Sequence, residues 1–158
     1  MTAPTLRLTR FTKLGQVGDY QHEIQNTDES MFFFFPDNTK ETGRSGAACI
    51  RGHSRAIGVP TIMNDESVRR PFTDIIEAMP YVEEAIDERI PDCYVREGFT
   101  FSLPVCDERM KLPDGRVIPV LGCGTYDVPL DVRKYITLKI FLHLKKYSRN
   151  GDVNIVEV

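Results

Sequence analysis

The sequence predicts a single three-layer α/β domain, in which helices cover both faces of a mixed β-sheet. Short apolar or β-branched runs typical of strands alternate with segments of helical periodicity. A turn sequence between two strand-like runs adds an antiparallel hairpin, so a purely parallel sheet is not expected. With 158 residues, 41% of them hydrophobic, the chain fits one domain over residues 1–158 that buries a core without disulfides or metal.

The first elements are predicted to be a strand, a short helix and a second strand. Leu6 and Leu8 alternate with polar residues, which is the pattern of a strand with one covered face. A polar connection follows, with a short helix predicted around residues 20–24. The apolar run 31–35 is typical of a central strand covered on both faces. Pro36 is expected to end that strand.

The next part of the chain predicts a helix, a strand and a second helix. Small residues without strand alternation predict a short helix over residues 46–55, followed by a strand over 56–62. Pro60 removes a ladder donor, which places this strand at an edge or makes Pro60 its last regular residue. Thr73 and Asp74 form a helix start. The apolar residues on one face of that helix are Ile75, Ile76, Met79, Val82 and Ile86.

Proline and glycine punctuate the following segment. Pro80 interrupts the helical pattern and predicts a kink or two consecutive short helices. Residues 94–105 are rich in aromatic and β-branched side chains and are predicted to form a strand. Pro113-Asp114-Gly115 then has the composition of a tight turn, so a hairpin is expected there.

The end of the sequence predicts a long helix and a closing strand. Apolar residues recur at helical spacing from Val132 to Tyr147, and Pro129 suits the first turn of that helix. His143 falls on the apolar stripe, which favours a core histidine over a catalytic one. The β-branched tail 153–158 is predicted to be a strand.

Charge and hydropathy exclude some classes of function. The net charge of −3 and the pI near 5.6 argue against a protein that binds nucleic acid polymers, because that affinity comes from clustered Lys and Arg. No stretch approaches the roughly 20 apolar residues of a membrane span, and the amino terminus has no apolar signal core. We therefore expect a soluble cytoplasmic protein without a membrane partner.

The four cysteines predict neither a metal site nor a redox pair. Cys49, Cys93, Cys106 and Cys123 have no C-x-x-C spacing and no histidine at zinc-like spacing. Reduced thiols in a cytosolic protein are the expected state. No metal or other cofactor is expected.

Two glycine-bearing loops carry the functional hypothesis, because each follows an apolar strand-like run and leads into a predicted helix. The first contains Asn38 and Gly43-Arg44-Ser45-Gly46-Ala47-Ala48, and the second is Gly122-Cys123-Gly124-Thr125-Tyr126. Such loops present free backbone N–H groups and the positive end of a helix dipole to an anion. Open α/β sheets bind ligands beyond the carboxyl ends of their strands. Two such loops in one domain predict a nucleotide-binding cleft.

These loops resemble those of macro domains, which place an asparagine after a central strand and small-residue loops before helices. The order of motifs is most similar to that of small uncharacterised bacterial and bacteriophage proteins with F-G-S-N, G-R-x-G-A, A-I-P-T and I-G-C-G. In this chain the motifs read Phe35-Pro36-Asp37-Asn38, Gly43-Arg44-Ser45-Gly46-Ala47, Ala56-Ile57-Gly58-Val59-Pro60-Thr61 and Leu121-Gly122-Cys123-Gly124.

The resemblance implies a macro-domain-like fold and a small nucleotide ligand such as ADP-ribose. Asn38 would then hydrogen-bond the distal ribose, and Tyr126 would pack against a sugar or base. The resemblance further implies that ribose and phosphates are lined by Gly43, Arg44, Ser45, Gly46, Ala47, Gly122, Cys123, Gly124 and Thr125. Amide nests, an aromatic face and close-approaching glycines favour the same ligand on physical grounds.

Each residue also has a purely structural alternative. Asn38 would cap a turn, and the loop glycines would supply positive φ angles. Arg44, Arg51 and Arg55 would either pair with phosphate or remain solvated surface charges. Cys123 at a helix start would be a nucleophile only with a base nearby, and the sequence shows none beside it.

Asp127 separates two of the functional hypotheses. A carboxylate there would accept a ribose hydroxyl or activate water, and otherwise it would complement the helix dipole. The first hypothesis is a protein that sequesters an ADP-ribose-type or cyclic nucleotide, such as a phage-encoded anti-defence sponge in the host cytoplasm. The second is a hydrolase of an ADP-ribosyl linkage that uses Asn38 and Asp127. The third is a protein-interaction module with structural glycine loops. The sequence permits a homo-oligomer in each case.

Overall fold

The computed structural model describes residues 2–10, 17–122 and 127–158, which form a mixed seven-stranded sheet. The strand order is β4-β3-β2-β5-β1-β7, and β6 pairs with β5 off this path. Five strands are parallel, whereas β4 and β6 are antiparallel to β3 and β5. The predicted α/β class and mixed sheet are confirmed. The strands are β1 (Thr5–Arg10), β2 (Met31–Asn38), β3 (Ala56–Asn64), β4 (Arg69–Pro71), β5 (Thr100–Lys111), β6 (Val117–Leu121) and β7 (Asn154–Glu157).

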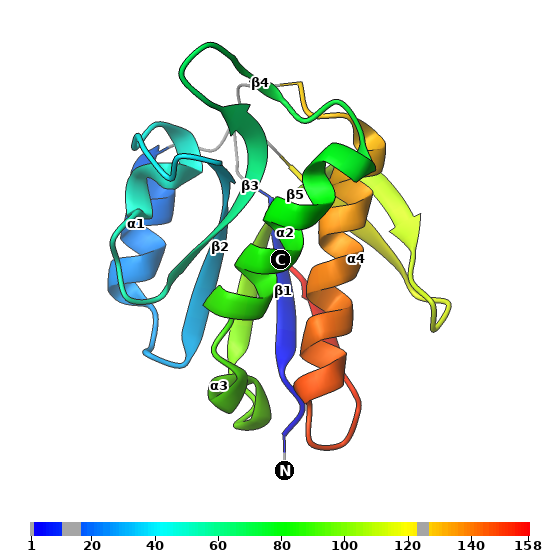
Figure 1. Ribbon diagram of the computed structural model, residues 1–158. Helices are drawn as coiled ribbons and strands as arrows, with labels where there is room; N and C mark the ends of the chain where they lie inside the picture. Colours follow the sequence, from blue (N-terminus) through cyan, green and yellow to red (C-terminus); the bar gives the residue numbers. More distant parts are fainter. Residues whose placement is uncertain (1, 11–16, 123–126) are drawn as a thin grey trace.

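Helices cover both faces of this sheet (Figure 1). The reason is visible in β2, whose side chains alternate between two apolar clusters. Phe32 and Phe34 belong to the larger cluster, under α2 and α4, whereas Phe33 and Phe35 pack against α1 and η1. The predicted central position of β2 is therefore confirmed. The helices are α1 (Val17–Asn26), the 3-10 helix η1 (Gly46–Ile50), α2 (Ile75–Arg89), α3 (Asp92–Arg96) and α4 (Leu130–Tyr147).

The prediction that Pro36 ends its strand is wrong, because β2 continues to Asn38. The Phe33 N–H donates to Arg55 O, on the β3 side of the strand. Alternate residues point to opposite sides, so the Pro36 nitrogen faces the β5 side. Pairing between β2 and β5 stops at Phe33, so no ladder bond is lost at Pro36.

Two predictions for the segment after β2 are wrong in part. The helix predicted over residues 46–55 is only the short η1, and Gly52 with φ of 91° turns the chain soon after its end. Pro60 is not the last regular residue, because β3 runs to Asn64. The strand does lack a β4 partner at Pro60, since β4 pairs only with residues 62–64.

The helix start predicted at Asp74 is confirmed, since its carboxylate accepts a hydrogen bond from the Glu77 N–H at 2.9 Å. Pro80 does not divide the helix, which runs unbroken from Ile75 to Arg89. Its ring removes the bond to the Ile76 carbonyl, but Ile76 is exposed, so water can replace the donor. The predicted apolar face is wrong at Ile76 and Met79, because the buried residues of α2 are Ala78, Val82, Ala85 and Ile86.

The strand predicted over residues 94–105 begins later, because Tyr94 lies in α3 and β5 starts at Thr100. Gly98 turns the chain between them with φ of 81°, and a Cβ there would lie 2.6 Å from Thr2 O. The predicted hairpin is confirmed by β5 and β6, with Gly115 at φ of 95°.

The long carboxy-terminal helix and the closing strand are confirmed as α4 and β7. His143 is buried, as predicted, and its Nε2 lies 2.8 Å from Asp92 Oδ1, which ties α4 to α3. No helix within the described segments is long and apolar enough to cross a bilayer.

Candidate functional site

The two predicted loops leave the sheet at the same edge. β2 ends at Asn38, and Val105 of β5 lies opposite Arg10, the last residue of β1. Val105 also pairs with Leu121 of β6. A strand residue has one neighbour on each side, so Leu121 lies on the side of β5 that faces away from β1 and towards β2. The carboxyl edge of the parallel strands therefore carries both loop starts on the same side of β5.

The chain turns to opposite faces of the sheet after these two loops. From β2 it enters η1 on the face covered by α1, and from β6 it enters α4 on the other face (Figure 1). β2 and β6 both lie beside β5, and the carboxyl edge between connections that turn to opposite faces is where open α/β sheets hold ligands. Of the residues predicted in these two loops, the structure describes Asn38, 43–48, Gly122 and Asp127.

The Asn38 side chain organises the first loop. Its Nδ2 donates to Thr42 O at 2.7 Å, and its Oδ1 accepts from Lys40 N at 3.0 Å and from Asn64 Nδ2 at 3.3 Å. Asn38 is buried, with 5% exposed. Asn38 therefore caps the turn, and these hydrogen bonds occupy both the oxygen and the nitrogen of its side-chain amide.

Behind the first loop lies a buried carboxylate, Asp37, which was not among the residues predicted for the site. Its side chain is only 1% exposed, and Arg51 Nη2 lies 2.6 Å from Oδ1 while Arg51 Nη1 lies 3.1 Å from Oδ2. Arg89 Nη1 is 3.7 Å from Oδ2. A Cβ at Gly58 would lie 2.5 Å from Oδ2, so this position requires glycine. Because Arg51 also donates to Thr42 O and Gly43 O, the buried ion pair holds the loop.

The three arginines weighed as phosphate ligands have three different environments. Arg51 binds Asp37, and Arg55 donates to the carbonyls of Ile24, Asp28 and Met31, which fixes the end of α1. Arg44 is exposed and forms no ion pair with any residue that the structure describes. Arg44 is thus the one of the three whose guanidinium is available to an anion.

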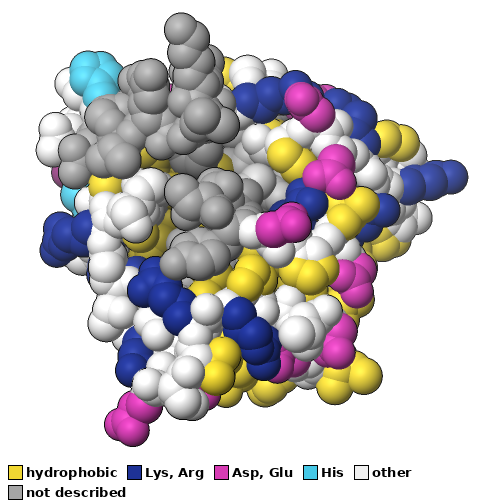
Figure 2. Space-filling model, turned by 90° about the horizontal axis from the view of Figure 1, so that it is seen from above, with side chains coloured by type: hydrophobic (Ala, Val, Ile, Leu, Met, Phe, Trp, Pro, Cys, Tyr) yellow, Lys and Arg dark blue, Asp and Glu magenta, His cyan; other side chains and the backbone are white. Residues whose placement is uncertain are grey.

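The backbone from Gly43 to Ala47 is open to an acceptor. None of its five N–H groups donates a hydrogen bond within the described part of the chain. Gly43 and Gly46 have φ of 87° and 60°, and a Cβ on either would meet nothing within 4 Å. Ser45 precedes η1 without a side-chain cap. Figure 2 views this edge from above and shows Lys and Arg interspersed with Asp and Glu, so the charge is mixed.

The second loop is described only at its two ends. Gly122 packs on β5, since a Cβ there would lie 3.1 Å from the Val105 carbonyl carbon. Asp127 is exposed, lies before the Pro129 cap of α4, and has no hydrogen bond or ion pair among the described residues. The remaining predicted ligand residues, Cys123, Gly124, Thr125 and Tyr126, lie outside the described residues.

Arg133 of α4 holds the described end of this second loop. Its Nε donates to Val128 O at 2.9 Å, its Nη1 lies 3.2 Å from Cys106 Sγ, and its Nη2 lies 2.8 Å from Glu108 Oε1. These contacts join the start of α4 to β5. Arg133 was not among the residues predicted for the site.

Comparison with known proteins gives a family and no function. A family model matches residues 16–94, half of the chain, and is described as a family of unknown function (DUF7831). The chain belongs to this family. The match contains the first loop and the Asp37 ion pair, whereas the second loop lies outside it. No curated protein and no solved structure matches the chain.

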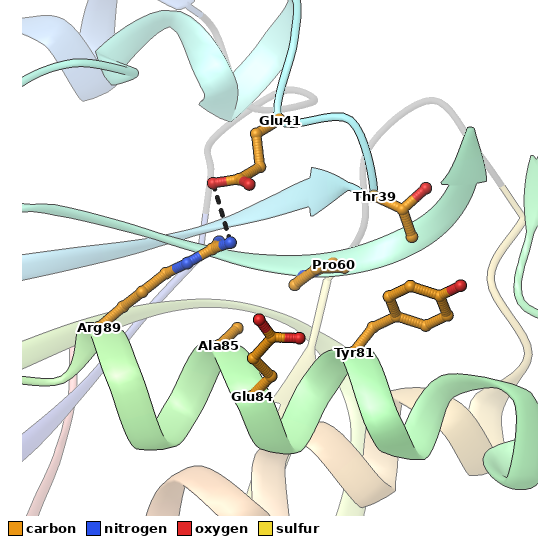
Figure 3. A pocket seen from close by; sticks show the side chains of 7 residues that line it. All are labelled: Thr39, Glu41, Pro60, Tyr81, Glu84, Ala85 and Arg89. Carbon is orange, nitrogen blue, oxygen red and sulfur yellow. Dashed lines mark ion pairs between the residues drawn. The ribbon is translucent and has the colours of Figure 1, made fainter. Parts of the chain in front are cut away.

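In this DUF7831 chain a cavity of about 160 Å³ lies between the end of β2 and α2 (Figure 3). Its volume is below the roughly 300–1,000 Å³ of pockets for drug-sized ligands, so it admits a side chain and not a nucleotide. Glu41 lies at one end, 2.8 Å from Arg89 Nη2. Its φ of 56° is a left-handed conformation that costs an L-residue about 1–2 kcal/mol. The lining includes Thr39, Glu41, Pro60, Tyr81, Glu84 and Arg89.

One sequence signal could have revealed the Asp37 cluster of this DUF7831 chain. A charged residue next to a continuous apolar run will be buried and must be paired, so a partner arginine was to be expected. The sequence does not say which arginine is the partner. Arg51 directly follows η1 and Arg89 ends α2, and only the fold brings both to Asp37.

Proposed function

We propose that this protein binds and sequesters an ADP-ribose-type or cyclic nucleotide at the carboxyl edge of its sheet. The observation that carries the proposal is the run of five backbone N–H groups from Gly43 to Ala47 that donate no hydrogen bond within the described residues. Successive free N–H groups beside glycines of positive φ form a concave anion site, and phosphate oxygens are its usual ligands. The second loop starts from the end of β6 at the same edge, so in this proposal Asp127 would approach the ligand from the opposite side.

Preorganisation supports binding by this loop. The Asp37–Arg51 ion pair and the Asn38 side chain hold residues 39–43 from within, so ordering them on ligand binding costs little entropy. Lys40 and Arg44 are exposed and unpaired among the described residues, which leaves two cations to neutralise a diphosphate.

The state of Asn38 argues against the ribose contact expected of it, and it weakens the hydrolase hypothesis, whereas binding by the backbone N–H groups does not need this side chain. The hydrolase hypothesis needs this amide to position a sugar, but its two ends are already hydrogen-bonded to Thr42, Lys40 and Asn64. Asp127 alone, without a described acid or base that contacts it, does not form a catalytic pair.

The test is to incubate the protein with ADP-ribose, cyclic ADP-ribose isomers and cyclic dinucleotides, and to measure melting temperature and the mass of the recovered ligand. Intact ligand together with a raised melting temperature supports sequestration. Altered ligand supports the hydrolase, and no shift with any of these nucleotides overturns the proposal.

A matched pair of variants tests the backbone site itself. Ser45 has φ of −83°, close to the angle that proline imposes, and its N–H makes no described hydrogen bond. Ser45→Pro should therefore weaken nucleotide binding about tenfold while changing the ligand-free melting temperature little. Ser45→Ala keeps the N–H and should bind normally. Equal affinities for both variants would remove this loop from the site.

A second pair of variants tests the charge. Arg44→Glu should abolish most of the ligand-induced melting shift, because it places a carboxylate beside the phosphates. Arg149→Glu reverses an exposed charge beyond the far end of α4 and serves as the control. A loss that is the same in both variants would indicate a general charge effect.

A further inference from the structure

We propose that the outer face of α2, together with the cavity beside it, is a docking surface for a protein segment that carries a lysine four residues from an apolar side chain. This surface is separate from the Gly43–Ala47 backbone. It lies on the α2 face of the sheet, whereas the first loop leads into η1 on the other face.

The apolar half of the surface is at the start of α2. Ile76 is 81% exposed, which is unusual for isoleucine, and Met79 and Tyr81 are also exposed. Ile76, Pro80 and Glu84 recur every four residues and so share one face of the helix. The Tyr81 ring is fixed by stacking on Phe72, with centroids 5.6 Å apart. A rigid aromatic next to exposed aliphatic groups suits protein contact.

The charged half of the surface has one negative charge too many. Among the described residues that line the cavity, Glu41 and Glu84 are acidic and Arg89 is the one cation, which already pairs with Glu41 at 2.8 Å. Glu84 forms no ion pair among the described residues, although it lines the cavity with Tyr81 (Figure 3).

Two features of this half favour a single ammonium group as its occupant. Glu88 follows Glu84 at the i+4 position, where like charges repel, so a bound cation would reduce this repulsion within α2. An ammonium group would balance Glu84 and lie near the Tyr81 ring, which is a favourable cation–π partner.

The geometry sets the spacing of the occupant. Ile76 and Glu84 are eight helical residues apart, a distance of about 12 Å. An extended peptide covers about 13 Å in four residues. A leucine over Ile76 therefore places a lysine four positions away at the cavity, whose volume of about 160 Å³ admits one side chain.

The experiment is an NMR titration of the isotope-labelled full chain with the peptide acetyl-Gly-Leu-Gly-Ala-Gly-Lys-Gly-amide in about 0.15 M salt, which screens non-specific attraction. The expected shifts lie on α2 and on residues 39–41. A peptide with norleucine in place of lysine should bind at least fivefold more weakly. Free butylamine tests whether the ammonium group alone is the ligand.

Three variants complete the test. Glu84→Gln and Ile76→Ser should each weaken binding of the peptide about fivefold, and both positions are exposed, so the fold should be kept. Glu97→Gln removes an exposed charge at the end of α3 and should have no effect.

Four results would overturn the proposal. They are the absence of shifts on α2 at millimolar peptide, equal effects of Glu84→Gln and Glu97→Gln, binding of butylamine as tight as that of the peptide, and self-association of the chain through this face.

Discussion

Replacing Arg51 by methionine should destabilise the fold by about 3 kcal/mol. Methionine keeps much of the side-chain volume but leaves Asp37, whose side chain is 1% exposed, without its nearest cation. Breaking a buried ion pair from one side costs about 3–5 kcal/mol. We expect the lower end, because Asn38 N–H still donates to Oδ1 at 2.7 Å and Arg89 remains at 3.7 Å.

The assay is urea unfolding followed by far-UV circular dichroism. With a slope of about 2 kcal/mol per M urea, a loss of 3 kcal/mol lowers the midpoint by about 1.5 M. Arg44→Met is the matched control, because this exposed arginine forms no described ion pair, and it should change stability by less than about 0.5 kcal/mol.

A double variant distinguishes an isolated charge from lost packing. Adding Asp37→Asn to Arg51→Met removes the unpaired carboxylate, so the double variant should be clearly more stable than the sum of the two single losses predicts. A cost below about 1 kcal/mol for Arg51→Met, or strict additivity in this cycle, would refute the role given to the buried pair.

Three further changes have expected outcomes that equilibrium unfolding can measure. Gly58→Ala should cost about 1–3 kcal/mol, because its Cβ would lie 2.5 Å from the buried Asp37 carboxylate; an unchanged midpoint would contradict the close contact. Asp74→Ala should cost about 1 kcal/mol by removing the cap on Glu77 N–H, whereas Asp74→Asn should retain most of it. Burial, and then the charge of Glu83, raises the pKa of Tyr135 to about 12. The stability that the protonated Tyr135 hydroxyl contributes is therefore complete below pH 10 and is lost as the pH rises towards 12. Tyr135→Phe should flatten this alkaline loss, and an unchanged pH profile would show that another group causes it.

Local sequence signals predicted the elements whose chemistry is local. Asp74 caps α2, Gly115 closes the hairpin and Pro129 precedes α4, because capping and turn conformations depend on a few neighbouring residues. Tyr94 was misplaced because aromatic residues favour strands on average, whereas here its ring stacks on Phe99 from a short helix, with centroids 4.6 Å apart.

The residues of the site were less predictable because their partners are distant in sequence. Asn38 was identified as a candidate, but its contact with Asn64 requires the register of β2 and β3. Pro36 was misread because only the sheet order shows which side of β2 has lost its neighbour. Asp37 was not predicted as a site residue, because its second partner, Arg89, lies in a helix that follows β3 and is 52 residues further along the chain.

The place of β2 between β3 and β5 limits what the family-matched segment can do alone. That segment, residues 16–94, contains β2 but lacks β5 and α4, so a truncated chain would leave Phe32 and Phe34 without Phe101 and the helix that covers them. It would also expose the unpaired side of a phenylalanine-rich strand, which is a template for aggregation. Expression of this half by itself should yield insoluble material. Binding by the first loop therefore requires both halves of the sheet.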